Sequence, residues 1–199
     1  MRLYSYILKD DYGFAPNPFF GNCTLACCKP KIRKGAQIGD WVVGLTPKPL
    51  GNRVAYAMRV DEKLTFTEYW NDPRFSCKKP DYTRDGAVYR QGDNIYEPAS
   101  PGCFRQLHSR HSDGELECSE HKTRDLEGTF VLIANRFFYF GSGAIALPTQ
   151  FSCLVVGRAH KCNFPESLVQ EFISFVSNRQ PGVNAPPRNW PSNDLTWKQ

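Results

Sequence analysis

The chain has 199 residues, a length that predicts one domain with short appendages. Its net charge of +5 and pI near 8.8 permit a polyanionic partner but fall short of the concentrated positive charge of a strong DNA binder. No window reaches the ~18 apolar residues that a membrane span needs, and the first residues lack the pattern of a secretory signal. We therefore expect a cytoplasmic protein, without a membrane partner, whose eight cysteines are reduced.

The first half of the chain carries three strand signals and one helix signal. Alternating side chains over Arg2–Leu8 predict a strand. Residues 10–31 form a long irregular segment whose Gly and Pro residues break regular structure, while its aromatic side chains argue against disorder. Trp41–Leu45 and Val54–Val60 predict two strands that pair antiparallel, because the loop between them is short and rich in breakers. Thr65–Asn71 predicts a short helix.

The second half begins with a polar, Gly- and Pro-rich stretch that holds one short predicted strand, Phe104–Leu107. Thr129–Phe140 is the strongest strand signal, dense in β-branched and aromatic residues and broken near Ala134–Asn135; we expect it in the same sheet as the earlier strands. The apolar run Phe151–Val156 predicts a further strand. Pro165–Asn178 predicts a helix, since Pro suits a first turn and apolar residues recur at helical spacing.

These elements predict an α+β domain over residues 1–178. We expect a curved, mostly antiparallel sheet, or a partly closed barrel, with the C-terminal helix packed on it. Residues 179–199 are polar and rich in proline and show no apolar period. We expect this tail to drape over the fold or to be disordered, and to be dispensable for folding.

Two polar clusters could carry chemistry. In Gly92–Tyr96, Asp93 and Asn94 either form a turn or read a base edge, since an amide offers both a donor and an acceptor. In His108–Ser112, an imidazole beside hydroxyl groups can act as a general acid or base, and a surface loop is the alternative. His108, His111, Cys118 and His121 also have spacings that resemble a zinc tetrad, but such spacings arise easily by chance, so we expect no metal.

Two basic segments could bind anions. Cys27 and Cys28 either host a reactive thiolate or are structural, and the neighbouring Lys29, Lys31, Arg33 and Lys34 either face phosphates or form a solvated surface. Gly157–Lys161 places Arg158 and His160 after an apolar run, which suits an anion site or a surface turn. The chain has no GxxxxGK[ST] loop, no GxSxG elbow and no HExxH motif, which removes common NTPase, hydrolase and metalloprotease interpretations.

Several segments match one family in order along the chain: Tyr12–Arg33, IGDWVVG (Ile38–Gly44), YWNDPRF (Tyr69–Phe75), GDNIY (Gly92–Tyr96), His111-Ser112, FFYFG (Phe137–Gly141) and GRAHK (Gly157–Lys161). Together they resemble the nucleotide modification associated domain family, second type, over residues 1–178. That family is associated with base modification in bacteria and their phages and has no assigned activity. Residues 39–75 are also similar to base-recognising barrels of the PUA, ASCH and EVE type, which implies a PUA-like barrel.

The resemblance implies functional positions, which are Asn17, Cys23, Lys29, Pro30, Arg33, Asp40, Trp41, Asp93, Asn94, Tyr96, His111, Ser112, Tyr139, Gly141 and His160. It implies recognition or modification of a nucleotide, free or in nucleic acid, with other nucleic-acid modification proteins as further partners and no cofactor.

Three functions remain open. A binding module would stack a base on Trp41, Tyr96 or Tyr139 and read it with Asp93 and Asn94, with Ser112 and Arg158 as further nucleotide contacts and Lys29, Lys31 and Arg33 on phosphates. An enzyme would use His111 or His160 as acid or base and Asp93 to orient the substrate or a metal. A non-catalytic subunit of a modification or defence complex is the third. In the first two cases, Asp93, Asn94, Tyr96, His111 and His160 should converge on one concave surface walled by Trp41 and Tyr139.

Overall fold

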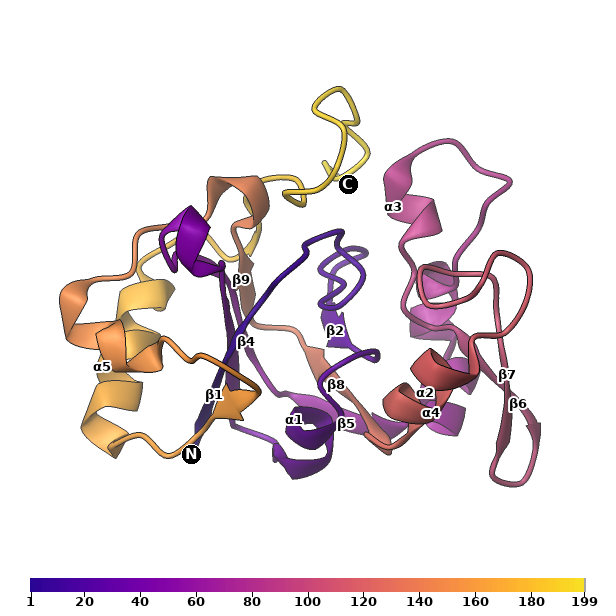
Figure 1. The fold of residues 1–199 in the computed structure, drawn as a ribbon, viewed down its shortest axis with the longest axis horizontal. Helices are drawn as coiled ribbons and strands as arrows, with labels where there is room; N and C mark the ends of the chain where they lie inside the picture. The colour runs from indigo at the N-terminus through magenta and orange to yellow at the C-terminus, as the bar shows by residue number, and fades with distance from the viewer. Residues whose placement is uncertain (199) are drawn as a thin grey trace.

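The computed structural model describes residues 1–198 as an α+β fold with three sheets (Figure 1). The largest sheet has the order β10-β1-β3-β4-β9-β11. Its strands are β1 (Leu3–Ile7), β3 (Trp41–Leu45), β4 (Val54–Arg59), β9 (Phe137–Tyr139), β10 (His160–Lys161) and β11 (Gly182–Val183). β1 pairs with β3, and β9 with β11, in parallel; the other pairs are antiparallel.

Two smaller sheets complete the strands. The second has the order β2-β8-β5, all antiparallel, from β2 (Cys23–Leu25), β8 (Phe130–Ala134) and β5 (Glu62–Thr65). The third is the hairpin of β6 (Tyr96–Ser100) and β7 (Cys103–Gln106). The sheets stay separate over residues 1–198 and do not close into a barrel. The fold is therefore α+β and mostly antiparallel as expected, but the PUA-like barrel is not confirmed.

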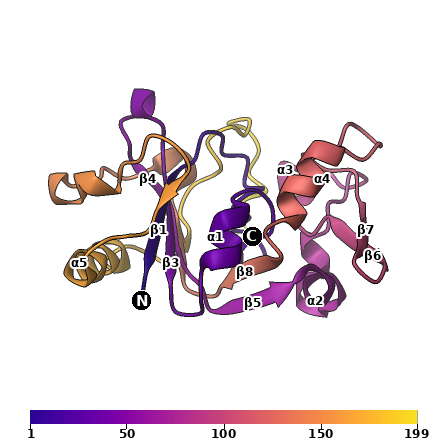
Figure 2. The ribbon, with the colours of Figure 1, turned by 60° about the horizontal axis from the view of Figure 1, so that its bottom comes forward.

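Within residues 1–198, five α-helices connect and cover the sheets. They are α1 (Pro30–Gly35), α2 (Phe66–Asn71), α3 (Ala87–Arg90), α4 (Ser119–Leu126) and α5 (Glu166–Ser177), and four short 3-10 helices lie at Lys48–Leu50, Pro73–Lys78, Gly141–Gly143 and Thr149–Leu154. Figure 2 shows α5 on the outer side of the largest sheet, the second sheet in the middle, and α2, α3 and α4 with the hairpin on the far side. None of the helices in residues 1–198 is both long and apolar enough to span a membrane.

Alternation along the strands gives the largest sheet two buried faces. Side chains such as Trp41, Val43 and Phe138 pack with Phe172 of α5, whereas Val42 and Met58 point to the opposite face and pack with Leu132 of the second sheet. A strand covered on both faces has no position for polar side chains, which is why β3 and β4 read as nearly continuous apolar runs.

The structure confirms most of the predicted elements. β3 and β4 pair antiparallel, β1 and β7 lie where strands were expected, and α2 and α5 match the two predicted helices. The run over residues 129–140 does break at Asn135, and its two parts enter different sheets, β8 beside β5 and β9 beside β4. The expectation that the run joins the sheet of β3 and β4 therefore holds for β9 and is wrong for β8.

One predicted strand is wrong. Residues 149–154 form a 3-10 helix whose Phe151 and Leu154 face the core, since side chains three apart share a face of such a helix. α1 and α4 were not anticipated. α4 is so polar that it buries Asp125 rather than an apolar stripe, so its periodicity carries little signal.

The long segment 10–22 is ordered by a buried lysine. The Nζ of Lys78 lies at 2.8 Å from Asn17 Oδ1, and it also donates to the carbonyl oxygens of Asn17, Phe19 and Asn22. A buried ammonium group is costly unless it has such partners. The irregular loop is therefore tied to the protein interior, and its aromatic side chains are packed.

The C-terminal tail lies over the body of the protein, the first of the two expected alternatives, and it is packed there by specific contacts. Its strand β11 extends the largest sheet next to β9. Trp190 is 8% exposed, stacks on Phe19 with ring centroids 5.2 Å apart, and donates its indole N–H to the carbonyl oxygen of Tyr12 at 2.7 Å. The backbone N–H of Asn189 donates to the carbonyl oxygen of Asp11 at 2.9 Å.

Candidate functional site

A cavity of about 350 Å³ opens where the C-terminal end of β1, the turn before α1, the loop before α4 and α4 itself meet. Its walls combine aromatic rings with cationic, imidazole and thiol groups and one carboxylate. The lining residues are Tyr6, Ile7, Leu8, Lys9, Asp10, Tyr12, Phe14, Ala15, Cys28, Lys29, Arg110, His111 and His121. Flat apolar walls with a few converging polar groups are typical of a small-molecule site.

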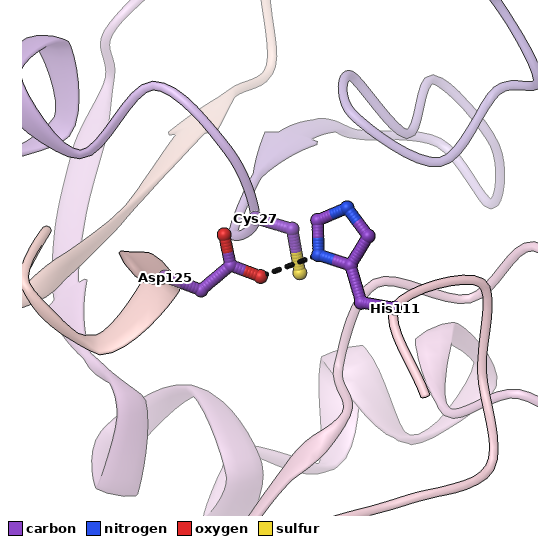
Figure 3. A group of neighbouring side chains, drawn as sticks. All are labelled: Cys27, His111 and Asp125. Carbon is purple, nitrogen blue, oxygen red and sulfur yellow. Dashed lines mark hydrogen bonds and ion pairs between the residues drawn. The ribbon is translucent and has the colours of Figure 1, made fainter. Parts of the chain in front are cut away.

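A thiol, an imidazole and a carboxylate lie in a line at this cavity. The Nε2 atom of His111 lies 3.5 Å from the Sγ of Cys28, and its Nδ1 lies 2.6 Å from Oδ2 of Asp125. Cys28 is partly exposed, whereas Asp125 is fully buried behind His111, as Figure 3 shows for the His111–Asp125 contact. A nucleophile beside a base that a third group orients is the general pattern of covalent catalysis.

The backbone at Cys28 is held in an unusual conformation. Cys28 has φ 58° and the next residue, Lys29, has φ 43°, both in the left-handed region that non-glycine residues rarely adopt. The Cys28 N–H donates to Oδ1 of Asp125 at 2.7 Å, so the same carboxylate holds both the imidazole and the backbone of the cysteine. Such outliers persist only where the surroundings enforce them.

Arg33 supplies much of that enforcement and does not face phosphates, which corrects the sequence-based expectation. Its side chain is fully buried, its Nε donates to the carbonyl oxygen of Cys28 at 2.7 Å, and its Nη1 donates to that of Phe130 at 2.8 Å. Its Nη2 donates to the carbonyl oxygen of Asp125. A Cβ on Gly128 would lie 2.3 Å from the guanidinium carbon, so a larger residue there would displace the Arg33 side chain.

The charge state of the site follows from burial and hydrogen bonding. Burial favours neutral imidazole, but the hydrogen bonds to Asp125 and Cys28 outweigh it and raise the pKa of His111 to about 9. Burial likewise opposes ionisation of Asp125, yet His111 and Arg33 hold the pKa of that carboxyl below its ordinary value. Tyr96 donates its hydroxyl to Oδ2 of Asp125 at 2.8 Å. At neutral pH the pair is therefore an imidazolium and a carboxylate.

Cys27 lies close to the same pair of His111 and Asp125. Its ligand atom and those of His111 and Asp125 lie within 4.8 Å of one another, and Figure 3 shows the three side chains converging. His111 Nδ1 and Asp125 Oδ2 are hydrogen-bonded to each other, however, and burial raises the pKa of the Cys27 thiol well above its ordinary value. Both features oppose ligation of a metal by this group, because a metal needs the deprotonated thiolate and free lone pairs.

The tetrad suggested by spacing does not assemble in residues 1–198, where the three residues above are the one group whose ligand atoms lie in mutual reach. His108 stacks on Tyr82 with centroids 3.9 Å apart, and Cys118 precedes α4. His121 instead stacks on His111 with centroids 4.3 Å apart. Burial, together with the positive charges of His111 and Arg124, lowers the pKa of His121.

Asp93 and Asn94 lie in the interior and do not line the cavity. The Asp93 carboxylate accepts hydrogen bonds from Thr24 and Tyr69, both at 2.7 Å, and burial raises its pKa. The Asn94 amide donates to the carbonyl oxygens of Tyr69 and Phe75, both at 3.2 Å. The two residues tie the 92–96 segment to α2 and the 3-10 helix after it, so their geometry fits a structural role.

The other predicted contacts are scattered. Trp41 is 1% exposed and stacks on Phe138 in the core under α5, and Tyr139 is buried with its hydroxyl on Asp11. Tyr96 lies behind the cavity on Asp125, and Ser112 closes its own turn through the Ser109 backbone. None of these four residues lines the cavity.

The basic residues divide between cavity and solvent. Lys29 lines the cavity with its ammonium group 4.3 Å from the centroid of the Tyr6 ring. Lys31 is exposed, and Arg158 lines a neighbouring cavity. His160 lies in β10, its ring 5.8 Å from that of Tyr4. Of the five residues expected on one concave surface, His111 alone lines the cavity, so the predicted convergence is corrected.

Sequence reasoning missed Asp125 and the aromatic wall. Asp125 sits in a polar helix four residues after His121, a spacing that places both on one face, but the helix itself was not predicted. Tyr12 and Phe14 were noted as aromatic residues of an irregular loop, without a sign that they face a cavity. The guanidinium group of Arg110 stacks on Tyr12 with 3.1 Å between its carbon and the ring centroid.

The raised pKa of His111 predicts a loss of stability at alkaline pH. A group whose pKa rises on folding stabilises the protein fully below its unfolded value, near 6.5, and loses that contribution as pH rises through about 9. Urea unfolding of the wild-type chain should show the free energy of unfolding falling by on the order of 2 to 3 kcal/mol between pH 6 and pH 9.5. His111→Gln should remove most of this slope, while His108→Gln should retain it.

The family of the chain follows from a comparison with family models. The model for nucleotide modification associated domain 2 matches residues 1–194. This match includes both the segment that carries Cys28 and the helix that carries Asp125, as well as most of the tail. Comparison with curated proteins and with solved structures finds no match. Because the match spans nearly the whole sequence, the chain belongs to the nucleotide modification associated domain 2 family.

Proposed function

We propose that this protein modifies a nucleotide through a covalent step in which Cys28 is the nucleophile. His111 acts as its acid and base, and Asp125 fixes the ring of His111 and stabilises its positive charge. The observation that carries the proposal is the continuous contact from the Cys28 sulfur through both ring nitrogens of His111 to the buried carboxylate, at the wall of a cavity. The family description supports nucleotide modification as the general role.

The walls of the cavity support a nucleobase as the reacting group. Tyr12 is partly exposed and offers aromatic surface beside the buried rings of Tyr6 and Phe14. Base stacking on such a ring contributes about 1–3 kcal/mol. Lys29 and Arg110 supply positive charge beside the rings for a phosphate group. This assigns nucleotide contact to a different aromatic set from the one that sequence alone suggested.

The proposed step is addition of the sulfur to an electrophilic ring carbon, which in a pyrimidine is C6. The imidazolium form of His111 directs Nε2–H toward the Cys28 sulfur and places a positive charge beside the nucleophile. The sulfur electron pair forms the new S–C bond, the C5–C6 electron pair moves to C5, and C5 takes a proton from His111 Nε2. Reversal of the same transfers releases the base unchanged, with His111 serving in both directions, so a net modification results only where an electrophile other than the proton is added at C5 before the sulfur leaves.

Alkylation kinetics test the nucleophile. Cys28 should react with iodoacetamide at pH 7 at least tenfold faster than Cys77, Cys103 and Cys153, which are exposed, since an ordinary thiol is only a few per cent ionised at that pH. Site-resolved mass spectrometry measures each rate in one sample, so the three exposed cysteines are internal references. A pyrimidine nucleoside monophosphate should slow the reaction at Cys28 while leaving the references unchanged.

The outcome separates the three functions considered from sequence. A fast Cys28 that nucleotide protects supports the enzyme. Protection of a slow Cys28 would instead favour a binding module. A slow Cys28 that no nucleotide protects would contradict the proposal and favour a non-catalytic subunit.

A further inference from the structure

A second cavity adjoins the first and carries a different chemistry. It has a volume of about 560 Å³ and shares Ile7, Lys9 and Lys29 with the first cavity, so the two cavities are neighbours separated by these side chains. Its remaining walls are Pro47, Lys48, Asn52 and residues 155–159, which include Arg158. The 3-10 helix Lys48–Leu50 and the loop before β10 therefore form its outer rim.

All the charged side chains that line the second cavity are positive. Lys9, Lys29, Lys48 and Arg158 line it, and no acidic residue does. Within residues 1–198, none of these four side chains forms an ion pair, whereas Arg59, Arg74, Arg105 and Lys122 are all paired with carboxylates. A cavity with one sign of charge concentrates counter-ions, so this one attracts anionic groups.

We propose that the second cavity binds the phosphodiester backbone of a single-stranded polynucleotide whose target base occupies the first cavity. The inference rests on the proposed function and adds its substrate class. Lys29 lines both cavities, so a phosphate that it binds lies next to the target base. Lys48 and Arg158 line the second cavity alone and can bind the phosphates that follow along the strand. A base held in the first cavity is unpaired, which favours a single strand over a duplex.

The phosphates of a free nucleoside triphosphate are the other source of the same charge. A triphosphate normally arrives with Mg²⁺, and sites for it usually provide a carboxylate ligand for the metal. The second cavity has none, and its cations come from separate segments rather than from one phosphate-cradling loop. Both features favour single negative charges spaced along a backbone over a compact metal-bound triphosphate.

Fluorescence anisotropy with labelled 12-nucleotide single strands, one of DNA and one of RNA, tests the proposal. Lys48→Gln combined with Arg158→Gln should weaken binding about tenfold or more at 0.1 M salt and reduce the slope of log K against log salt by about 1.4, because two phosphate contacts are lost. The control is Arg179→Gln combined with Lys198→Gln, which removes the same charges from residues that line neither cavity and should retain wild-type affinity and slope. Comparison of the two strands identifies which polynucleotide is preferred.

Two results would overturn the proposal. One is equal affinity and equal salt slope in the double variant and the wild type. The other is a nucleoside triphosphate that binds as tightly as the 12-nucleotide strand and loses the same affinity in the double variant. The alkylation experiment is independent of both. If Cys28 is unreactive but strand binding depends on Lys48 and Arg158, the covalent step is wrong and the second cavity still binds the polynucleotide. If Cys28 is reactive but strand binding does not depend on these charges, the covalent step stands and the polynucleotide proposal is wrong.

Discussion

Replacing Asp125 by asparagine is expected to lower the alkylation rate of Cys28 at pH 7 by about ten- to thirtyfold, because a thiol without a charged partner is only a few per cent ionised. The carboxylate accepts from His111 Nδ1 at 2.6 Å and sustains its positive charge. An amide nitrogen in that place would donate to Nδ1 and force the proton of neutral imidazole onto Nε2. His111 could then neither take the Cys28 proton nor stay protonated.

Two controls separate this effect from loss of structure. Asp113→Asn makes the same change at an exposed carboxylate in the loop before α4 and should leave the rate unchanged. Tyr96→Phe removes one hydrogen bond to Asp125 but keeps its charge, so it should preserve most of the reactivity. An NMR titration of the His111 ring should show its pKa falling from about 9 in Asp125→Asn but not in Asp113→Asn. An unchanged Cys28 rate in a folded Asp125→Asn protein would contradict the assigned role.

The elements that could be predicted from sequence are those whose signal is local. β3, β4, β8, β9 and α5 are dense apolar runs with clear breaks, so composition and period located them. The order of the strands in the sheets was less accessible, because the parallel pair β1–β3 and the split of residues 129–140 between two sheets depend on contacts distant in sequence. The 3-10 helix at residues 149–154 shows that an apolar run alone does not distinguish a strand from a tight helix.

The candidate site was only partly predictable for the same reason. His111 was identified because imidazole titrates near neutral pH, and Cys28 was noted as a possible thiolate. What makes them a pair is Asp125, which lies 97 residues after Cys28 and reaches it through a helix with no apolar stripe. Conversely, Asp93 lies in a polar turn-like cluster and Arg33 in a cluster of basic residues, so sequence favours ligand contacts for both, yet both satisfy buried partners. Sequence alone does not distinguish a charged side chain that binds a ligand from one that forms hydrogen bonds inside the protein.

The tail gives the second large expected effect. Ending the chain after Arg179 should reduce the free energy of unfolding by about 4 kcal/mol, the scale of losing one buried Trp side chain. For a protein of this length, that corresponds to a melting temperature lower by roughly 10 °C. The truncation removes β11 from the sheet and uncovers Phe19, and it takes away the partners of Asp11, whose buried carboxylate accepts from the Arg188 N–H at 3.3 Å.

A chain that ends after Pro191 is the matched control, because it keeps β11, Trp190 and the contacts to Asp11 and should retain most of the stability. Trp190→Ala in the full chain should reproduce much of the loss, whereas Leu195→Ala, at a 58% exposed side chain, should not. The tail also reaches the site: Trp190 donates to the carbonyl oxygen of Tyr12, whose ring forms the cavity wall under Arg110. Trp190→Ala should therefore weaken nucleotide protection of Cys28 even at temperatures where the variant remains folded. Melting of the Arg179-terminated chain within a few degrees of the full chain would instead show that these contacts add little, and that the tail is dispensable for folding.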